Sequence, residues 1–242
     1  MIAIKTERLT KRYKDILAVD SLSLCINEGE LFSLLGVNGA GKTTTVKMLS
    51  CLTKPTEGDA YLLGKSISSD TSTVKSFIAV SPQETAVAPG LSVRENLELI
   101  CGVHGFSKLK QSKKIDELTS LLGLDSVLAR KAGKLSGGWQ RRLSIAMALI
   151  SEPRILFLDE PTLGLDVIAR SELWDIIRTL KGKVTIILTT HYMEEAESLS
   201  DRVGIMKDGK LLICDSVANI KICAKTDSFE NAFIRIVKEG GI

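Results

Sequence analysis

The chain contains two kinds of hydrophobic pattern. Residues 1–34 have the composition of β-strands, in the segments "MIAIKTERL", "AVDSLSLCI" and "LFSLL", with a turn at "NEGE". The segments "AYLLG" and "SFIAVS" indicate two further short strands. The later segments "RILFLDE" and "VTIILTTH" are continuous apolar runs. Runs of this kind are typical of strands that are buried on both faces, as in a parallel sheet.

The pattern changes to that of helices between about residues 84 and 150. Ser92 and Glu95 have the spacing of a capping box, which opens an amphipathic helix in "LSVRENLELI". In "SKKIDELTSLLG" a stripe of apolar residues at helical spacing runs up to Gly123, which marks the helix end: Ile115, Leu118, Leu121 and Leu122.

Helices also alternate with strands later in the chain, because "ARSELWDIIRTL" separates the two continuous apolar runs. The turn "KDGK" joins "RVGIM" to "LLICD" as a hairpin. We therefore predict an α/β fold with a mostly parallel sheet, an N-terminal antiparallel β-subdomain and a helical insert. We expect one domain over residues 1–242, divided into a core with its β-subdomain (1–83 and 151–212), a helical subdomain (84–150) and a short C-terminal tail (213–242).

Composition and charge exclude several classes of protein. The net charge of +3 is too small to indicate a nucleic-acid partner, and none is expected. Five scattered cysteines without C-x-x-C spacing indicate reduced thiols rather than disulfides or a zinc site. The start "MIAIKTERLTKRYKD" is too charged for a signal peptide, and no apolar run has membrane-spanning length. A membrane role would therefore depend on a partner.

The stretch "LGVNGAGKTTT" provides the first candidate site. The spacing from Gly36 to Lys42 and Thr43 matches the phosphate-binding loop G-x-x-x-x-G-K-[ST] between a strand and a helix. Free N–H groups at the helix start attract phosphate, Lys42 adds a positive charge, and the Thr43 hydroxyl can bind Mg²⁺. We predict a P-loop fold that binds a nucleoside triphosphate through Gly36, Asn38, Gly39, Ala40, Gly41, Lys42, Thr43 and Thr44.

Polar residues at the ends of the buried strands extend this site. Asp159 and Glu160 end "ILFLDE", where an aspartate in nucleotide hydrolases helps to bind Mg²⁺. Because strand side chains alternate, Glu160 should point away from Asp159, and it can act as general base on the attacking water. His191, at the end of "VTIILTTH", can sense a γ-phosphate, and Gln83, after "SFIAVSP", can contact metal or water.

The stretch "KLSGGWQRRLSIAMALI" suggests a second anion site. Ser136 and two glycines precede an amphipathic helix, and Ser136 can simply be its N-cap. Arg141 and Arg142, however, lie near the positive end of that helix, and an anionic ligand there would offset their repulsion.

These motifs, in this order, resemble those of the nucleotide-binding subunit of an ATP-binding cassette (ABC) transporter over essentially the whole chain. The discriminating feature is "LSGG" (residues 135–138), the start of the family's signature motif, upstream of "LDEPT". The resemblance implies that ATP is the nucleotide and that two cassettes close head-to-tail over two ATP molecules. It implies that Ser136, Gly137 and Gly138 bind the γ-phosphate of ATP on a second subunit, that Asp166 shapes the dimer interface, and that Tyr13 stacks on adenine. Trp139 departs from the family pattern at the fifth signature position.

The resemblance also implies the partners. A second ABC subunit, identical or different, and an integral membrane permease are expected, with the chain peripheral on the cytoplasmic face of the membrane. "TTTVKMLSCLTKPTEGDAYLLG" and the end "TDSFENAFIRIV" look like cassettes of bacterial-type drug, antibiotic and lipid exporters. The alternative is a soluble ABC ATPase without a permease, for example in iron–sulfur cluster assembly. Intact Lys42, Asp159, Glu160 and His191 favour hydrolysis over a non-hydrolysing regulatory module.

Overall fold

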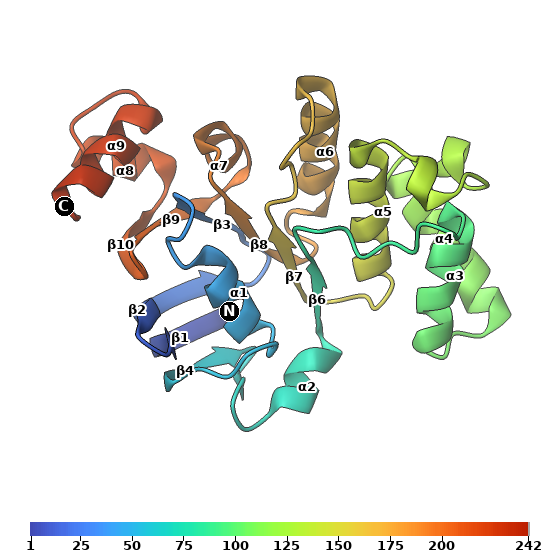
Figure 1. Cartoon of the computed structure of the whole chain (residues 1–242), viewed down its shortest axis with the longest axis horizontal. Helices are drawn as coiled ribbons and strands as arrows, with labels where there is room; N and C mark the ends of the chain where they lie inside the picture. The colour runs from blue at the N-terminus through green and yellow to red at the C-terminus, as the bar shows by residue number, and fades with distance from the viewer. Residues whose placement is uncertain (242) are drawn as a thin grey trace.

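Two β-sheets and the helices around them form the computed structural model, which describes residues 1–241 (Figure 1). The first sheet is four-stranded and antiparallel, in the order β2-β1-β4-β5, with β1 (Ile2–Tyr13), β2 (Ile16–Asn27), β4 (Glu57–Leu62) and β5 (Lys65–Ser66). The predicted N-terminal antiparallel β-subdomain is therefore confirmed.

The second sheet has six strands in the order β10-β9-β3-β8-β7-β6. β3, β6, β7, β8 and β9 are parallel, and β10 pairs with β9 as an antiparallel hairpin at one edge. The strands are β3 (Leu31–Gly36), β6 (Ile78–Ser81), β7 (Ile155–Asp159), β8 (Thr185–Thr190), β9 (Arg202–Lys207) and β10 (Lys210–Asp215). Asp208 and Gly209 both have positive φ, as a two-residue hairpin turn requires, so the predicted hairpin is confirmed.

Both faces of this sheet are buried, as the continuous apolar runs predict. In β7, Leu156 and Leu158 face a core shared with the helical segment and α6, while Ile155 and Phe157 face a core shared with α1 and the first sheet. The helices that follow the strands are α1 (Lys42–Leu49), α2 (Thr71–Ser76), α6 (Val167–Leu180) and α7 (Met193–Leu199).

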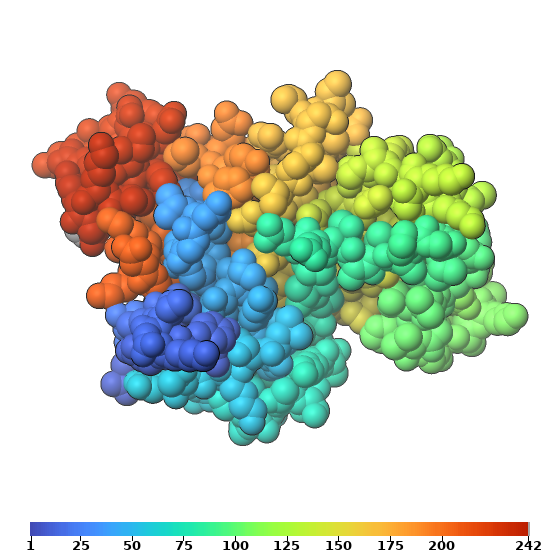
Figure 2. Space-filling model, in the orientation of Figure 1, coloured from blue at the N-terminus to red at the C-terminus, as the bar shows by residue number. Residues whose placement is uncertain are grey.

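The helical insert projects beyond β6 at one end of the molecule, opposite the C-terminal helices (Figures 1 and 2). It contains α3 (Val93–Val103), α4 (Lys108–Leu121), two short 3₁₀ turns (Asp125–Val127 and Ala132–Lys134) and α5 (Gly137–Leu149). The capping box is confirmed: Ser92 Oγ accepts a hydrogen bond from Glu95 N (3.2 Å), and Glu95 Oε2 accepts one from Ser92 N (2.7 Å). On α4, Ile115 and Leu118 are buried as predicted.

The last part of the chain forms two helices, α8 (Val217–Cys223) and α9 (Phe229–Glu239). Ile220, Phe233 and Ile236 from these helices share a small core with Val203 and Ile205 of β9. The segment that we describe as a tail from the sequence thus packs on the sheet next to α7.

Candidate functional site

The phosphate-binding loop joins β3 to α1, and two of its glycines are required by geometry. A Cβ atom on Gly41, whose φ is +102°, would lie 2.5 Å from the carbonyl oxygen of Ala18. A Cβ atom on Gly36 would lie 2.5 Å from the carbonyl oxygen of Met206 on the neighbouring strand. Any larger residue would push the loop away from these strands, so glycine fixes both the turn and the position of the helix start.

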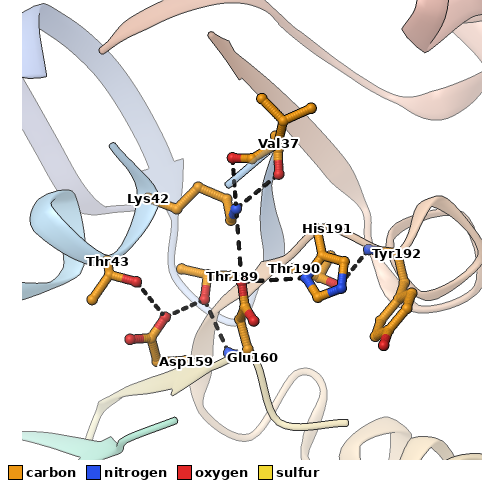
Figure 3. A network of polar contacts seen from close by, with 10 residues as sticks. Val37, Lys42, Thr43, Asp159, Glu160, Thr189, Thr190, His191 and Tyr192 are labelled. Carbon is orange, nitrogen blue, oxygen red and sulfur yellow. Dashed lines mark hydrogen bonds and ion pairs between the residues drawn. The ribbon is translucent and has the colours of Figure 1, made fainter. Parts of the chain in front are cut away.

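Lys42 is the first residue of α1, and its side chain is buried with 5% exposure. Its Nζ atom donates hydrogen bonds to the carbonyl oxygens of Gly36 (2.7 Å) and Val37 (3.2 Å) and lies 3.7 Å from Glu160 Oε1 (Figure 3). Burial lowers the pKa of Lys42, and the charges of Glu160 and Asp159 oppose this effect. The loop thus directs the ammonium group toward the carboxyl ends of the strands.

Asp159 ends β7 and forms a cluster of oxygen atoms with α1 and β8. Its Oδ1 atom accepts a hydrogen bond from Thr43 Oγ1 at 3.3 Å and another from Thr189 Oγ1 (Figure 3). Mg²⁺ prefers oxygen ligands of this kind, a carboxylate and a hydroxyl beside a phosphate site. The donor set of Asp159 and Thr43 therefore fits the predicted metal.

Glu160 leaves the strand in a left-handed conformation, with φ of +46°. Its backbone N–H donates to the carbonyl oxygen (3.1 Å) and the hydroxyl (3.0 Å) of Thr189 on β8. Its carboxylate, with the residue only 8% exposed, lies between Lys42 and His191, whose Nδ1 atom is 3.3 Å from Glu160 Oε1 (Figure 3). The strand alternation that we invoke is thus not the cause of its direction, because the strand has ended at Asp159.

These residues surround a cavity of about 660 Å³ at the carboxyl ends of β3, β7 and β8. Leu163, Asp208 and the β2 residues Ile16, Leu17 and Ala18 also line it. The predicted residues that line the cavity are Asn38, Gly39, Ala40, Gly41, Lys42, Thr43, Thr44, Gln83, Glu160 and His191. Gly36 contributes the carbonyl group that accepts from Lys42, and Asp159 contacts Thr43.

Tyr13 lies beside the cavity and not in its lining. It is 43% exposed at the end of β1, with Lys11 Nζ 4.9 Å from the centre of its ring. Its partner across the strand pair is Ile16, which does line the cavity. The end of the first sheet is therefore close to the nucleotide site, and stacking of Tyr13 on adenine stays a prediction.

The signature residues lie on a different part of the surface. Ser136 and Gly137 are exposed, and Ser136 precedes α5 without a hydrogen bond from its side chain to the helix. A Cβ atom on Gly138 would lie 3.1 Å from Cβ of Ala169, so the start of α5 packs against the start of α6. Asp166 caps α6, its Oδ1 atom accepting from Ala169 N at 2.9 Å. The structure thus places the signature residues and the predicted interface residue together, and it does not show the simple capping role for Ser136.

The expectation for the two arginines is wrong. Arg141 is buried and donates to the carbonyl oxygens of Pro82 and Gln83. Arg142 pairs with Glu172 of α6, and its guanidinium lies 4.9 Å from the ring centre of Trp139. Both charges therefore have partners inside the chain and need no anion at the start of α5. The same contacts fix Trp139 at the edge of the helical core.

Thr189 was not predicted as a site residue, although it joins Asp159 to Glu160 across β7 and β8. Its only signal was its position next to the end of a buried strand, two residues before His191. The strip of β2 at Ile16–Ala18 gave no signal, because its place at the cavity depends on how the two sheets pack. Within residues 1–241, every helix falls short of the length and apolar character that crossing a membrane demands.

Comparisons with known proteins identify the family of the chain. The profile of the family "ABC transporter" matches residues 19–163. Over 220 residues the chain is 38% identical to the daunorubicin/doxorubicin resistance ATP-binding protein DrrA of Streptomyces peucetius, covering 90% of this chain and 67% of that protein. It is 40% identical over 222 residues to the phospholipid-transporting ATPase ABCA3 of Homo sapiens, covering 90% of this chain and 13% of that protein. The chain therefore spans only a small part of that relative.

A solved structure also matches. The dimeric ATP-binding cassette MJ0796, in a post-hydrolysis state with ADP and Pi, aligns with a TM-score of 0.79 and 29% identity, over 88% of this chain and 98% of that chain. The chain belongs to the ABC transporter family, as the ATP-binding cassette, the type of subunit in which this family binds and hydrolyses ATP.

Proposed function

We propose that the chain binds Mg²⁺ and ATP in this cavity, dimerises head-to-tail around two ATP molecules, and powers a separate membrane permease by hydrolysis. The observation that carries the proposal is the convergence of Lys42, Glu160 and His191 in one cavity at the ends of β3, β7 and β8. A phosphate-binding lysine and a residue that acts on the nucleophile are recurring parts of phosphoryl-transfer sites.

Glu160 is positioned to act as the general base. Its carboxylate removes a proton from a water molecule as the water attacks the γ-phosphorus atom; the bond from that phosphorus to the bridging oxygen breaks, and ADP and phosphate leave. Lys42 stabilises the negative charge on the transferred phosphoryl group, and His191 orients the reacting groups beside Glu160. Thr43, Asp159 and Gln83 would hold Mg²⁺, which would offset negative charge on the phosphates.

The proposed dimer gives a role to the signature residues, which lie exposed at the start of α5. Ser136, Gly137 and Gly138 contact the γ-phosphate of the ATP bound to the partner subunit, and Asp166 lies at the same interface. Support comes from the exposure of Ser136, Gly137 and Asp166, from the free Ser136 hydroxyl, and from the likeness to a dimeric cassette.

The transported substrate belongs to the drug-like, antibiotic or lipid class, and transport is export. This rests on relatives whose names state resistance to daunorubicin and doxorubicin or transport of phospholipid. The chain is peripheral at the cytoplasmic face of the membrane, held there by the permease. The rival function is that of a soluble ABC ATPase, such as one in iron–sulfur cluster assembly.

Affinity purification of the tagged chain from detergent-solubilised membranes tests the proposal. We expect an integral membrane protein to co-purify in a fixed ratio, and the complex to hydrolyse ATP only when Mg²⁺ is present. Recovery of an active cassette dimer with soluble partners alone would favour the rival function. A chain without ATPase activity in either preparation would overturn the proposal.

A further inference from the structure

Arg141 on α5 is an unusual buried charge. The residue is 4% exposed, and its guanidinium faces the segment that follows β6. Nη1 donates to the carbonyl oxygen of Pro82 and Nη2 to the carbonyl oxygen of Gln83, both at 2.5 Å. Burial lowers the pKa of Arg141, while the more distant carboxylates of Asp159 and Glu195 oppose this effect. A buried guanidinium whose direct partners are backbone carbonyl groups is costly, and such groups are often retained for a specific geometry.

The residue that Arg141 holds belongs to the ATP cavity. Gln83 lines the cavity together with Lys42, Glu160 and His191. Arg141 donates a hydrogen bond to the backbone carbonyl group of Gln83, the residue from which this side chain extends. One helical turn further along α5, the hydroxyls of Ser144 and Ser81 lie 3.0 Å apart. The end of β6 is thus attached to α5 at three successive residues, and Gln83 is the last of them.

The helix that carries Arg141 begins at the signature motif. Arg141 is the fifth residue of α5, and Ser136 and Gly137 stand exposed at the start of the same helix. A helix moves as a unit over such a short distance, so a displacement of the signature residues is passed to Arg141 and through it to Gln83. We infer that Arg141 is a positioning residue: it sets Gln83 in the chain's own ATP cavity and couples it to the signature motif at the start of α5. This inference rests on the proposed head-to-tail dimer, in which that motif contacts the partner's ATP.

The geometry requires arginine and not merely a positive charge. The planar guanidinium group presents two terminal nitrogens in a fixed fork, and the two carbonyl groups come from consecutive residues. A lysine presents all its donors from one nitrogen atom, so it lacks the two separate nitrogens that fix the positions of both carbonyl groups. Arg141→Lys therefore keeps the charge and most of the side-chain volume while it removes the rigid two-nitrogen fork that holds the two carbonyl groups.

A double-mutant cycle on ATP hydrolysis by the permease complex tests the inference, with Arg141→Lys, Gln83→Ala and the double variant. We expect Arg141→Lys to lower kcat roughly tenfold or more, as misplaced catalytic groups do, with KM for ATP changed less than about twofold. In the Gln83→Ala background, Arg141→Lys should have little further effect, because it acts through Gln83. Thermal unfolding shows whether each variant is folded, and if Arg141→Lys is not, Arg141→Gln replaces it, since its amide can still donate to one carbonyl oxygen.

The neighbouring residue provides the matched control. Arg142→Lys changes the same residue type on the same helix, yet Arg142 contacts Trp139 and Glu172 and not the Gln83 segment. In the double variant, the fold-reduction in kcat from Arg142→Lys should multiply with the fold-reduction from Gln83→Ala. If the Arg141 and Gln83 effects also multiply in an enzyme that hydrolyses ATP, the inference is overturned and the proposed function stands. If the wild-type complex has no ATPase activity, the proposed function fails and the inference fails with it.

Discussion

Lys42 Nζ lies 3.7 Å from Glu160 Oε1, so the lysine of the phosphate-binding loop and the candidate general base form a buried ion pair. The two side chains are 5% and 10% exposed, and they come from segments more than a hundred residues apart in the chain. A charge at such a site loses its hydration, and removal of either partner leaves the other buried without this counter-charge. The pair therefore joins the candidate phosphate-binding lysine to the candidate base. We expect substitution of Lys42 to weaken ATP binding, and substitution of Glu160 to slow hydrolysis without weakening binding.

Lys42→Ala should abolish ATP hydrolysis and strongly weaken ATP binding. The substitution removes the charge that faces the β- and γ-phosphates and leaves the Glu160 carboxylate beside them, where like charges repel. Titration with ATP in a calorimeter, together with a phosphate-release assay, measures both effects. Near-normal turnover in this variant would be incompatible with the site that we describe.

Glu160→Gln should retain ATP affinity and lose nearly all turnover. Glutamine has the same shape but cannot accept the proton of the attacking water, and the loss of a general base costs roughly 10²–10⁴-fold in rate. Because hydrolysis is slow, ATP-bound dimers should accumulate and appear in size-exclusion chromatography with ATP. A variant that stays monomeric and fully active would show that Glu160 is not the base.

His191→Ala should lower kcat while the dimer still forms with ATP. Its Nδ1 atom lies 3.3 Å from Glu160 Oε1. The substitution therefore removes the neighbour of the Glu160 carboxylate on that side and leaves the carboxylate itself in place. Single-turnover kinetics separates this defect in chemistry from a defect in binding. A raised KM with unchanged kcat would instead assign His191 to ATP binding alone.

Glu195→Gln should stabilise the fold increasingly as pH rises. Glu195 is fully buried on α7, and its Oε1 atom accepts from Trp174 Nε1 at 3.1 Å. Burial raises the pKa of Glu195, against the opposing effects of Thr190, Thr162, Trp174 and Arg170. The folded state therefore binds the proton more tightly than the unfolded state, so the free energy of unfolding falls as pH rises above 4.5, the ordinary value of this group.

Glutamine removes this penalty, which amounts to about 1.4 kcal/mol for each unit by which the pKa is raised. Urea unfolding at about pH 5 and about pH 8 should show a larger gain for Glu195→Gln at the higher pH. Glu197→Gln, on the same helix and half exposed, is the control and should show no such growth. An equal effect of Glu195→Gln at both pH values would contradict the expected shift.

The positions of the site residues could be predicted because they follow buried parallel strands. The carboxyl ends of such strands meet at one edge of the sheet, so Asp159, Glu160 and His191 had to converge on the loop after β3. The partners of Arg141 could not be predicted in this way. They are Pro82 and Gln83, which lie 59 and 58 residues away in the chain, and the contact depends on how α5 packs beside β6. The same holds for Ile16, which reaches the cavity through the packing of one sheet on the other.

The helix α9 is a different case, because a signal was present. Its buried residues Phe229, Ala232, Phe233 and Ile236 have the spacing of one helical face, and Ser228 Oγ accepts from Asn231 N as an N-cap. The amphipathic pattern alone would have placed a packed helix where we expect a tail.

The last prediction concerns the two halves of each active site. A subunit with Lys42→Ala is mixed with a subunit that carries Ser136→Arg, a bulky change at the exposed start of α5. If Ser136 acts on the partner's ATP, the mixed dimer has one site with both defects and one intact site. Some ATPase activity should therefore return on mixing, although each variant alone is inactive. The phosphate-release assay measures this recovery, and cross-linking of differently tagged subunits shows that mixed dimers form.

If Ser136 instead acted within its own chain, each subunit in the mixture would carry a defect in its own site, and no activity would return. The two arrangements thus predict opposite results, recovery of ATPase activity or no recovery. The comparison requires that cross-linking detects the mixed dimer and that one intact site can turn over. A mixture of Lys42→Ala with Glu160→Gln is the control, because both residues line the cavity of one chain. Every site in that mixed dimer contains a defect, so activity should stay absent. Recovery in the control as well would mean that the two cavities do not act as separate sites, and the trans role of Ser136 would lose its support.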